Sequence, residues 1–205
     1  MADDPDTDAD DERPGLDRAA AAIDRGEVVV YPTETIYGLA ANALDAEAIE
    51  RVFSLKGRSP EKPVSMGLAS IEAVSEHTAP TTREREFLEA FLPGPVTVLL
   101  DRCESVPDVL TAGRDRVGVR VPDHDLARGL ARRCGPVTAT SANRSGGSNA
   151  RRVSELDPEI REGVAVVLDS DPTQGVESTV VDVDGSEIVR RGAGADAIEE
   201  WLAKQ

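Results

Sequence analysis

The segment EVVVYPTETIYGL, residues 27–39, predicts the centre of the fold. Its first half is a continuous β-branched and aromatic run, which is typical of a buried strand. A helix-like stretch, LDRAAAAIDR (16–25), precedes it and ends at Gly26, a residue that commonly terminates helices. Its second half places small hydroxyls directly after the strand, where α/β sheets hold their ligands. The segment therefore indicates an α/β protein with a candidate site at one strand end.

Strands and helices alternate along the rest of the chain. β-branched runs predict strands over residues 64–68, 96–101, 117–121, 137–140, 164–168 and 179–183. Helical spacing predicts helices over residues 45–56, 71–77, 82–91, 124–134 and 195–202. Asp184-Gly185 lies between two short β-branched runs and is a hairpin signal. We therefore expect a single α/β domain with a mixed sheet.

The charge of the chain is strongly negative. Residues 1–14 hold seven acids and one base, which gives −6 and predicts a disordered acidic tail before a folded domain over residues 15–205. The net charge is −16, so the remaining −10 belongs to the domain itself, and only three of the 23 basic residues are lysines. Such self-repulsion is screened by concentrated salt. We expect a halophilic protein from a salt-rich cytoplasm.

Composition also excludes several classes of protein. An acidic body is unsuited to broad contact with nucleic-acid phosphates. Cys103 and Cys134 have no metal-binding spacing, and two thiols favour a reducing compartment. No apolar run is long enough to span a bilayer, and no signal peptide is present. The sequence predicts a soluble cytoplasmic protein without a membrane partner.

Candidate phosphate-binding residues lie in KGRSPEK, residues 56–62, which contains two of the three lysines. Lys56 and Arg58 could neutralise a triphosphate and stabilise charge on a transferred phosphorus. The alternative is a solvated helix end, where basic residues complement the helix dipole. A second polar loop, TATSANRSGG (138–147), follows another predicted strand and suits phosphate or ribose contacts, although an ordinary Ser/Asn/Gly turn has the same composition.

Two further positions leave an alternative open. Thr33 could contact a polar substrate or cap a turn. Arg120 interrupts an apolar run, so it requires either a ligand anion or an internal carboxylate partner. No Walker motif, GxxxxGK[ST], occurs in the chain.

Taken in order, seven short motifs resemble those of the YrdC/TsaC family, from about Ala19 to Ala193: PTETIYGL, KGR, PGPVT, VGVRVP, TSANRSG, ESTVVD and VRRG. The resemblance implies the YrdC-like (RibB-like) fold, a twisted mixed sheet with helices, in a single-domain form without the extra C-terminal domain of longer relatives. It implies an L-threonylcarbamoyladenylate synthase, a nucleotidyltransferase. In that reaction the carbamate of L-threonine, made from bicarbonate, attacks the α-phosphorus of ATP and releases pyrophosphate.

The resemblance also implies what the partners and the nucleotide-binding residues are. Lys56 and Arg58 would grip the ATP phosphates as the catalytic pair. Ser141 and Asn143 would hold phosphate and ribose, and Arg190 would close on the nucleotide. Mg²⁺ would arrive with ATP, with no protein-held metal and no organic cofactor. The adenylate would pass to a separate threonylcarbamoyl transferase complex that modifies tRNA beside the anticodon, so contact with tRNA would be indirect.

For the amino-acid substrate, the resemblance assigns Thr33 and Ser178 to threonine binding and Arg120 to its carboxylate or carbamate end. Two departures from the family pattern concern the site. Gly67 occupies the position of a histidine in some relatives, and Arg191 replaces a proline, which leaves open whether Arg190 or Arg191 faces the nucleotide. Two other functions for the same fold stay open: an RNA-binding protein, and a carbamoyl-transfer module that uses carbamoyl phosphate.

Overall fold

The structure, a computed structural model, describes the backbone of residues 7–204 and the side chains from residue 15 onward. Helix α1 runs over Thr7–Asp24, so it begins nine residues before the helix predicted from residue 16. It includes residues 7–14 of the segment predicted as an acidic tail, whereas residues 1–6 of that segment lie outside the described residues. No helix in the described part of the chain is long and apolar enough to cross a membrane.

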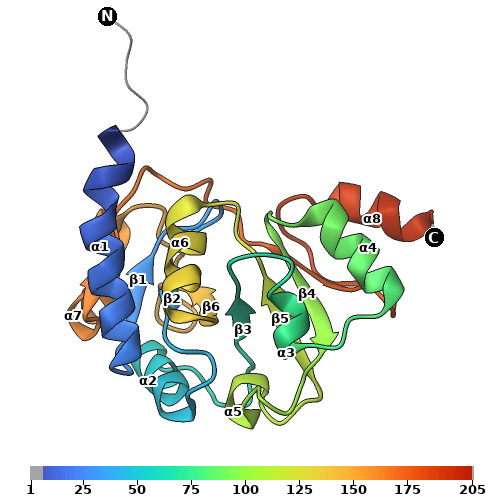
Figure 1. Cartoon of the computed structure of the whole chain (residues 1–205), viewed down its shortest axis with the longest axis horizontal. Helices are drawn as coiled ribbons and strands as arrows, with labels where there is room; N and C mark the ends of the chain where they lie inside the picture. The colour runs from blue at the N-terminus through green and yellow to red at the C-terminus, as the bar shows by residue number, and fades with distance from the viewer. Residues whose placement is uncertain (1–6, 205) are drawn as a thin grey trace, which may run out of the picture.

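One mixed sheet is the central element of the described residues (Figure 1). Its strands are β1 (Val29–Tyr31), β2 (Gly38–Ala40), β3 (Ser65–Gly67), β4 (Val96–Asp101), β5 (Arg116–Arg120), β6 (Val137–Ser141), β7 (Val166–Val167), β8 (Thr179–Asp182) and β9 (Glu187–Arg190). Their order across the sheet is β7-β1-β2-β6-β3-β5-β4-β8-β9. The pairs β1/β7, β3/β5 and β4/β8 are parallel, and the other neighbours are antiparallel. The expected α/β fold with a mixed sheet is confirmed.

Helices fill the connections between the strands. They are α2 (Ala46–Lys56), α3 (Val74–His77), α4 (Thr82–Phe91), α5 (Asp108–Thr111), α6 (Asp125–Cys134), α7 (Pro158–Gly163) and α8 (Ala195–Ala203), with a 3₁₀ turn, η1, at Val153–Glu155. In Figure 1, α1 and α6 lie side by side over one half of the sheet, and α4 and α8 lie together beside the other half.

Three apolar clusters hold these layers together. One cluster packs α1 and α6 against β1, β2 and β6, and a second packs α2 and α7 against the other face of β1 and β2. The largest lies between α2, α4, α8 and one face of β3, β4, β5 and β8. Because each half of the sheet is anchored by its own helices, the polar loops at the strand ends have a fixed base.

Strands β4 and β5 have one face in the largest apolar cluster, and no described helix packs on their opposite face, which lines a pocket. Val117 and Val119 of β5 belong to the largest apolar cluster, whereas the residues between and beside them point to the opposite face. Strand β4 repeats this pattern, with Val98 in the core and Thr97 and Leu99 on the other side. The uncovered face forms the floor of the pocket described next.

Candidate active site

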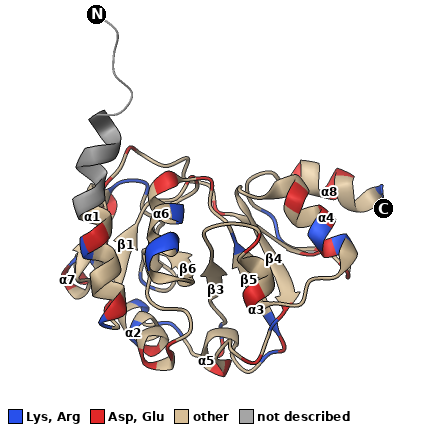
Figure 2. Ribbon diagram, in the orientation of Figure 1, with Lys and Arg blue, Asp and Glu red and all other residues tan. Residues whose placement is uncertain are grey.

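A pocket of about 550 Å³ lies on the uncovered face of the sheet. Six basic side chains line it: Lys56, Arg58, Arg114, Arg116, Arg120 and Arg190. Glu177 is the single acid in the same lining. This is the reverse of the whole chain, which carries −16 and shows Asp and Glu on its outer helices α1, α2, α4 and α8 (Figure 2). Such a concentration of positive charge suits an anionic ligand.

Helix α2 brings the first two basic residues to the pocket. Asp45 caps its N-terminus, where the carboxylate accepts hydrogen bonds from the backbone of Glu47 and Ala48. Gly57 ends the helix in the left-handed region, at φ 57°, and a glycine adopts this conformation without strain. The turn after Lys56 therefore directs Lys56 and Arg58 to one site, as the sequence predicts.

Lys56 is almost fully buried, with 1% of its surface exposed. Its ammonium donates to the backbone oxygens of Ser141 and Asn143, the latter at 2.8 Å, and to Asn143 Oδ1 at 3.1 Å. Burial and the nearby Arg58 lower the pKa of Lys56 to about 8, against a smaller opposing effect of Glu177. An ammonium has three N–H donors, so all of them are engaged with the 141–143 loop.

Arg58 is bound by the chain's backbone and not by an acid. Its Nε donates to Lys62 O at 3.0 Å and its Nη2 to Pro63 O at 2.9 Å. Burial, and then the positive charge of Arg190, lower its pKa. Among the described residues no carboxylate forms an ion pair with Arg58, so its charge is available to a ligand.

The polar loop after β6 lies against Lys56. Ser141 Oγ is 2.5 Å from Asn143 Oδ1, and Asn143 Nδ2 donates to Gly147 O. The backbone N–H of Ser145 donates to Lys56 O at 2.8 Å. Ser141 and Asn143 thus adjoin Lys56, the last residue of α2, across 85 residues of sequence.

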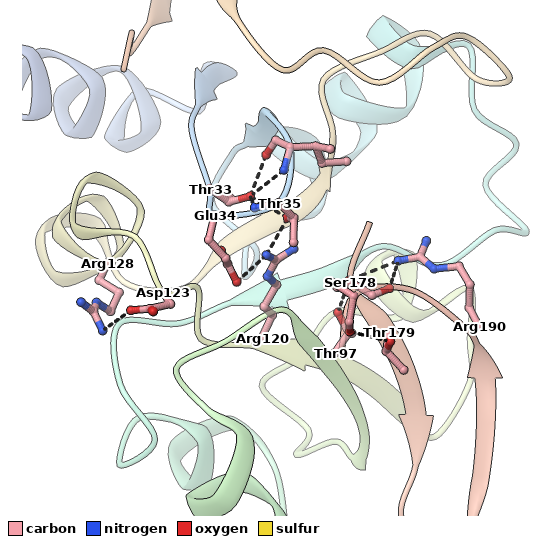
Figure 3. Close-up of polar contacts among 12 residues, drawn as sticks. Thr33, Glu34, Thr35, Thr97, Arg120, Asp123, Arg128, Ser178, Thr179 and Arg190 are labelled. Carbon is pink, nitrogen blue, oxygen red and sulfur yellow. Dashed lines mark hydrogen bonds and ion pairs between the residues drawn. The ribbon is translucent and has the colours of Figure 1, made fainter. Parts of the chain in front are cut away.

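Ser178 and Arg190 lie together in the pocket lining and contact each other (Figure 3). Arg190 Nη2 donates to Ser178 O at 2.8 Å, and Ser178 Oγ is 3.0 Å from Thr97 Oγ1. Arg190 also forms an ion pair with Glu177 at 2.9 Å. Arg191 instead pairs with two acids of α8, so the structure places Arg190, and not Arg191, in the pocket.

Thr33 and Arg120 form one buried network with the residues between them (Figure 3). Thr33 Oγ1 accepts from the backbone N–H groups of Thr35 and Ile36 and donates to Ile36 O at 2.7 Å. Arg120 Nη2 donates to Thr35 Oγ1 at 2.7 Å and pairs with Glu34 Oε1 at 2.8 Å. The turn-capping interpretation of Thr33 and the internal ion pair of Arg120 are therefore both present, and both residues also line the pocket.

Several pocket residues are not among the predicted site residues, including Arg114, Arg116, Thr97, Gly118 and Asn149. Thr97 and Gly118 are single positions inside strands, and strand alternation beside core valines is the signal that could reveal them. A Cβ on Gly118 would come within 2.6 Å of Ser65 Oγ, so the glycine keeps the floor open. Asn149 is joined to the site by a hydrogen bond to Glu177 and has no such signal. Gly67, the position of the relatives' histidine, lies in β3 outside the pocket lining.

Comparison with known proteins places the chain among relatives. A family model for Sua5, YciO and YrdC proteins, described as "Telomere recombination", matches residues 21–192. A Pyrococcus abyssi protein named threonylcarbamoyl-AMP synthase is 39% identical over 168 residues, which cover 80% of this chain and 49% of that protein. The chain thus spans about half the length of this relative.

Two solved structures share the fold. Pyrococcus abyssi Sua5 complexed with L-threonine has a TM-score of 0.82 at 36% identity, over 90% of this chain and 56% of that one. A Methanobacterium thermoautotrophicum protein solved in solution has a TM-score of 0.63 at 38% identity, over 95% and 96% of the two chains. With the family model matched across most of its length, this chain belongs to the Sua5/YciO/YrdC family.

Proposed function

We propose that this protein is an L-threonylcarbamoyladenylate synthase. L-threonine and bicarbonate condense to a carbamate with loss of water. A carbamate oxygen then attacks the α-phosphorus of ATP, so that one P–O bond forms and the bond to pyrophosphate breaks. The products are threonylcarbamoyl-AMP and pyrophosphate.

One observation carries this proposal: a single pocket combines six basic side chains with two separate hydroxyl-containing networks. The basic residues suit a triphosphate, and the hydroxyls suit a small polar second substrate. Relatives named threonylcarbamoyl-AMP synthase, and a relative complexed with L-threonine, point to the same pair of ligands.

The nucleotide would bind on the side of Lys56 and Arg58. We assign Arg58 to direct contact with the phosphates, because it is a cation without an acidic partner among the described residues. Lys56 would add its charge and hold Ser141 and Asn143 in place. Arg190 lines the same pocket, close enough for its charge to lower the pKa of Arg58, and would close on the nucleotide. These residues act by positioning the reactants and stabilising charge on phosphorus.

L-threonine would bind near Arg120, whose guanidinium suits its carboxylate or carbamate end. Ser178 would supply a hydroxyl contact. The hydroxyl of Thr33 is committed to its own loop, so we expect Thr33 to shape the pocket and not to donate to the substrate. Mg²⁺ would enter with ATP, since phosphate oxygens are its preferred ligands there. Among the described residues, no three His, Cys, Asp or Glu side chains gather at a possible metal site.

Threonylcarbamoyl-AMP is a mixed anhydride, so water competes with any enzyme that uses it. We propose that a threonylcarbamoyl transferase complex receives it in the cytoplasm and modifies tRNA, which this chain need not bind directly. The acidic outer surface agrees with this division of work.

The test is a product assay in molar KCl. The protein is incubated with ATP, Mg²⁺ and bicarbonate, with and without L-threonine, and pyrophosphate and the adenylate are measured by mass spectrometry. We expect both products only when threonine is present. Absence of a threonine-dependent product would overturn the proposal, and turnover of carbamoyl phosphate instead would favour the carbamoyl-transfer alternative.

A further inference from the structure

The buried carboxylate of Glu34 forms an ion pair with Arg120, the arginine that is expected to bind the amino-acid substrate. Glu34 follows β1, and its side chain is 10% exposed, while that of Arg120 at the end of β5 is 9% exposed. Glu34 Oε1 lies 2.8 Å from Arg120 Nη2. Arg120 lines the pocket and Glu34 does not, so the carboxylate contacts the pocket only through the arginine (Figure 3).

The hydroxyl groups of Thr33 and Thr35, next to this ion pair, can be assigned as donors or acceptors. Thr33 donates its proton to Ile36 O, so the 2.8 Å contact between Thr33 Oγ1 and Thr35 Oγ1 requires Thr35 to donate. The hydroxyl of Thr35 is then free to accept from Arg120 Nη2. One nitrogen of Arg120 is thus held from two sides, by Thr35 and by Glu34.

The charge of Glu34 has no other strong partner in the described part of the chain. Neither of its buried oxygens accepts a hydrogen bond of good geometry, and Arg120 is the cation with which it pairs. Burial makes an unpaired charge costly, so each member of the pair fixes the place of the other. A long arginine side chain without this partner would sample several orientations in the pocket.

We propose that Glu34 is a positioning residue for the amino-acid substrate. By occupying Nη2, it turns the remaining edge of the Arg120 guanidinium toward the pocket, where the carboxylate or carbamate of the substrate binds. This inference rests on the proposed synthase function. It predicts that Glu34 governs the affinity for threonine and leaves the affinity for ATP nearly unchanged.

The experiment measures pyrophosphate release while L-threonine and ATP are varied separately. We expect Glu34→Ala to raise the KM for threonine by about tenfold and to change the KM for ATP by less than about twofold. Glu34→Gln keeps the size of the side chain and an oxygen beside Nη2 but removes the charge, and should raise the threonine KM by only a few-fold. Glu47→Ala is the matched control, because it removes an exposed glutamate paired with Arg51 and should change neither constant.

A double-variant cycle separates positioning from a general structural role. In an Arg120→Ala background, removal of Glu34 should cause no further rise in the threonine KM, because Glu34 acts through Arg120. Equal rises in both KM values, or an unchanged threonine KM, would overturn the proposal while wild-type activity still supports the synthase. If Glu34→Ala does not fold, Glu34→Gln decides, and a threonine KM equal to that of wild type overturns it. A wild type without threonine-dependent pyrophosphate release contradicts the proposed function itself.

Discussion

Lys56 shows how burial changes what a single residue can do. The sequence predicts a lysine that grips phosphate directly, whereas the structure engages its three N–H groups with the loop that carries Ser141 and Asn143. A hydrogen bond to a ligand would require one of these contacts to be given up. We therefore expect Lys56 to contribute charge and loop position, and we propose Arg58 as the residue in direct contact with the phosphates.

The affinity for ATP should fall as the pH rises above about 8. Burial, together with Arg58, lowers the pKa of Lys56 to about 8, so its positive charge is lost there first. We expect ATP affinity to weaken by about tenfold between roughly pH 7.5 and 9.5, measured by calorimetry at constant Mg²⁺ and KCl. Arg58→Ala should bind about 100-fold more weakly near pH 7.5 and should shift the fall to higher pH, because Arg58 is one of the two causes that lower the pKa of Lys56. Lys56→Gln should lose the slope.

The titration of Lys56 does not itself destabilise the fold in this pH range. The folded-state pKa of Lys56 lies below the ordinary value of 10.5, so the unfolded chain binds this proton more tightly. The contribution of Lys56 to stability therefore rises with pH from about 8 to 10.5, opposite to the expected change in affinity. A wild-type slope as flat as that of Lys56→Gln would contradict the role of this charge.

The sequence indicates which residues lie in the pocket better than it indicates which hydrogen bonds they form there. Lys56, Arg58, Ser141, Asn143 and Arg190 all reach one pocket, as their order in the sequence suggests. The hydrogen bonds of Lys56 could not be foreseen, since they join two segments that only the sheet brings together. Arg190 illustrates this, because its ion pair with Glu177 depends on the pairing of β8 with β9.

At the scale of elements, strong local signals give accurate boundaries. Strand β4 and helix α4 coincide with the ranges predicted for them, and α4 begins with a capping box at Thr81 and Glu84. Strand β2 is missed because Gly38–Ala40 has no β-branched residue, and its place is set by pairing with β1 and β6. Helices α5 and α7 are too short for a clear helical period.

Helix α2 depends on its cap for the stability of the site. Asp45→Ala should lower the free energy of unfolding by about 1 kcal/mol, because two backbone N–H groups lose their acceptor. Asp45→Asn should be nearly neutral, since asparagine caps equally well. Urea unfolding measures both, with Glu50→Ala on the exposed side of the same helix as control. If Asn is as costly as Ala, the negative charge and not the cap stabilises the helix.

At the scale of the whole molecule, the arrangement of charge separates the pocket from the surface. The chain carries −16, yet the pocket lining holds six bases and one acid. Composition alone predicts the first fact and cannot predict the second, because Arg114, Arg116 and Arg120 line the pocket only once β5 is placed in the sheet. Arg116, Arg120 and Arg190 are ion-paired with acids, whereas Lys56 and Arg58 form no ion pair among the described residues, so an anionic ligand is expected to meet the positive charge of these two.

The same imbalance predicts that salt stabilises the protein. The Debye length falls from about 10 Å at 0.1 M to about 3 Å at 1 M, so KCl screens repulsion among acids on the surface. Salt also weakens ion pairs, but exposed pairs contribute only about 0–1 kcal/mol each. We expect the Tm at pH 7 to rise by roughly 5 °C or more between about 0.1 M and 2 M KCl, since about 1 kcal/mol shifts Tm by 2–4 °C at this size.

The pH dependence of this salt effect identifies its cause. Near pH 5 the protein approaches its isoelectric point of about 4.5, so little net charge remains to be screened and the rise in Tm should shrink. Calorimetric scans across KCl concentration at both pH values make the comparison, with sucrose as an uncharged control. A flat Tm at pH 7 would show that repulsion does not limit stability. An equal rise at both pH values would assign it to exclusion of salt from the protein surface.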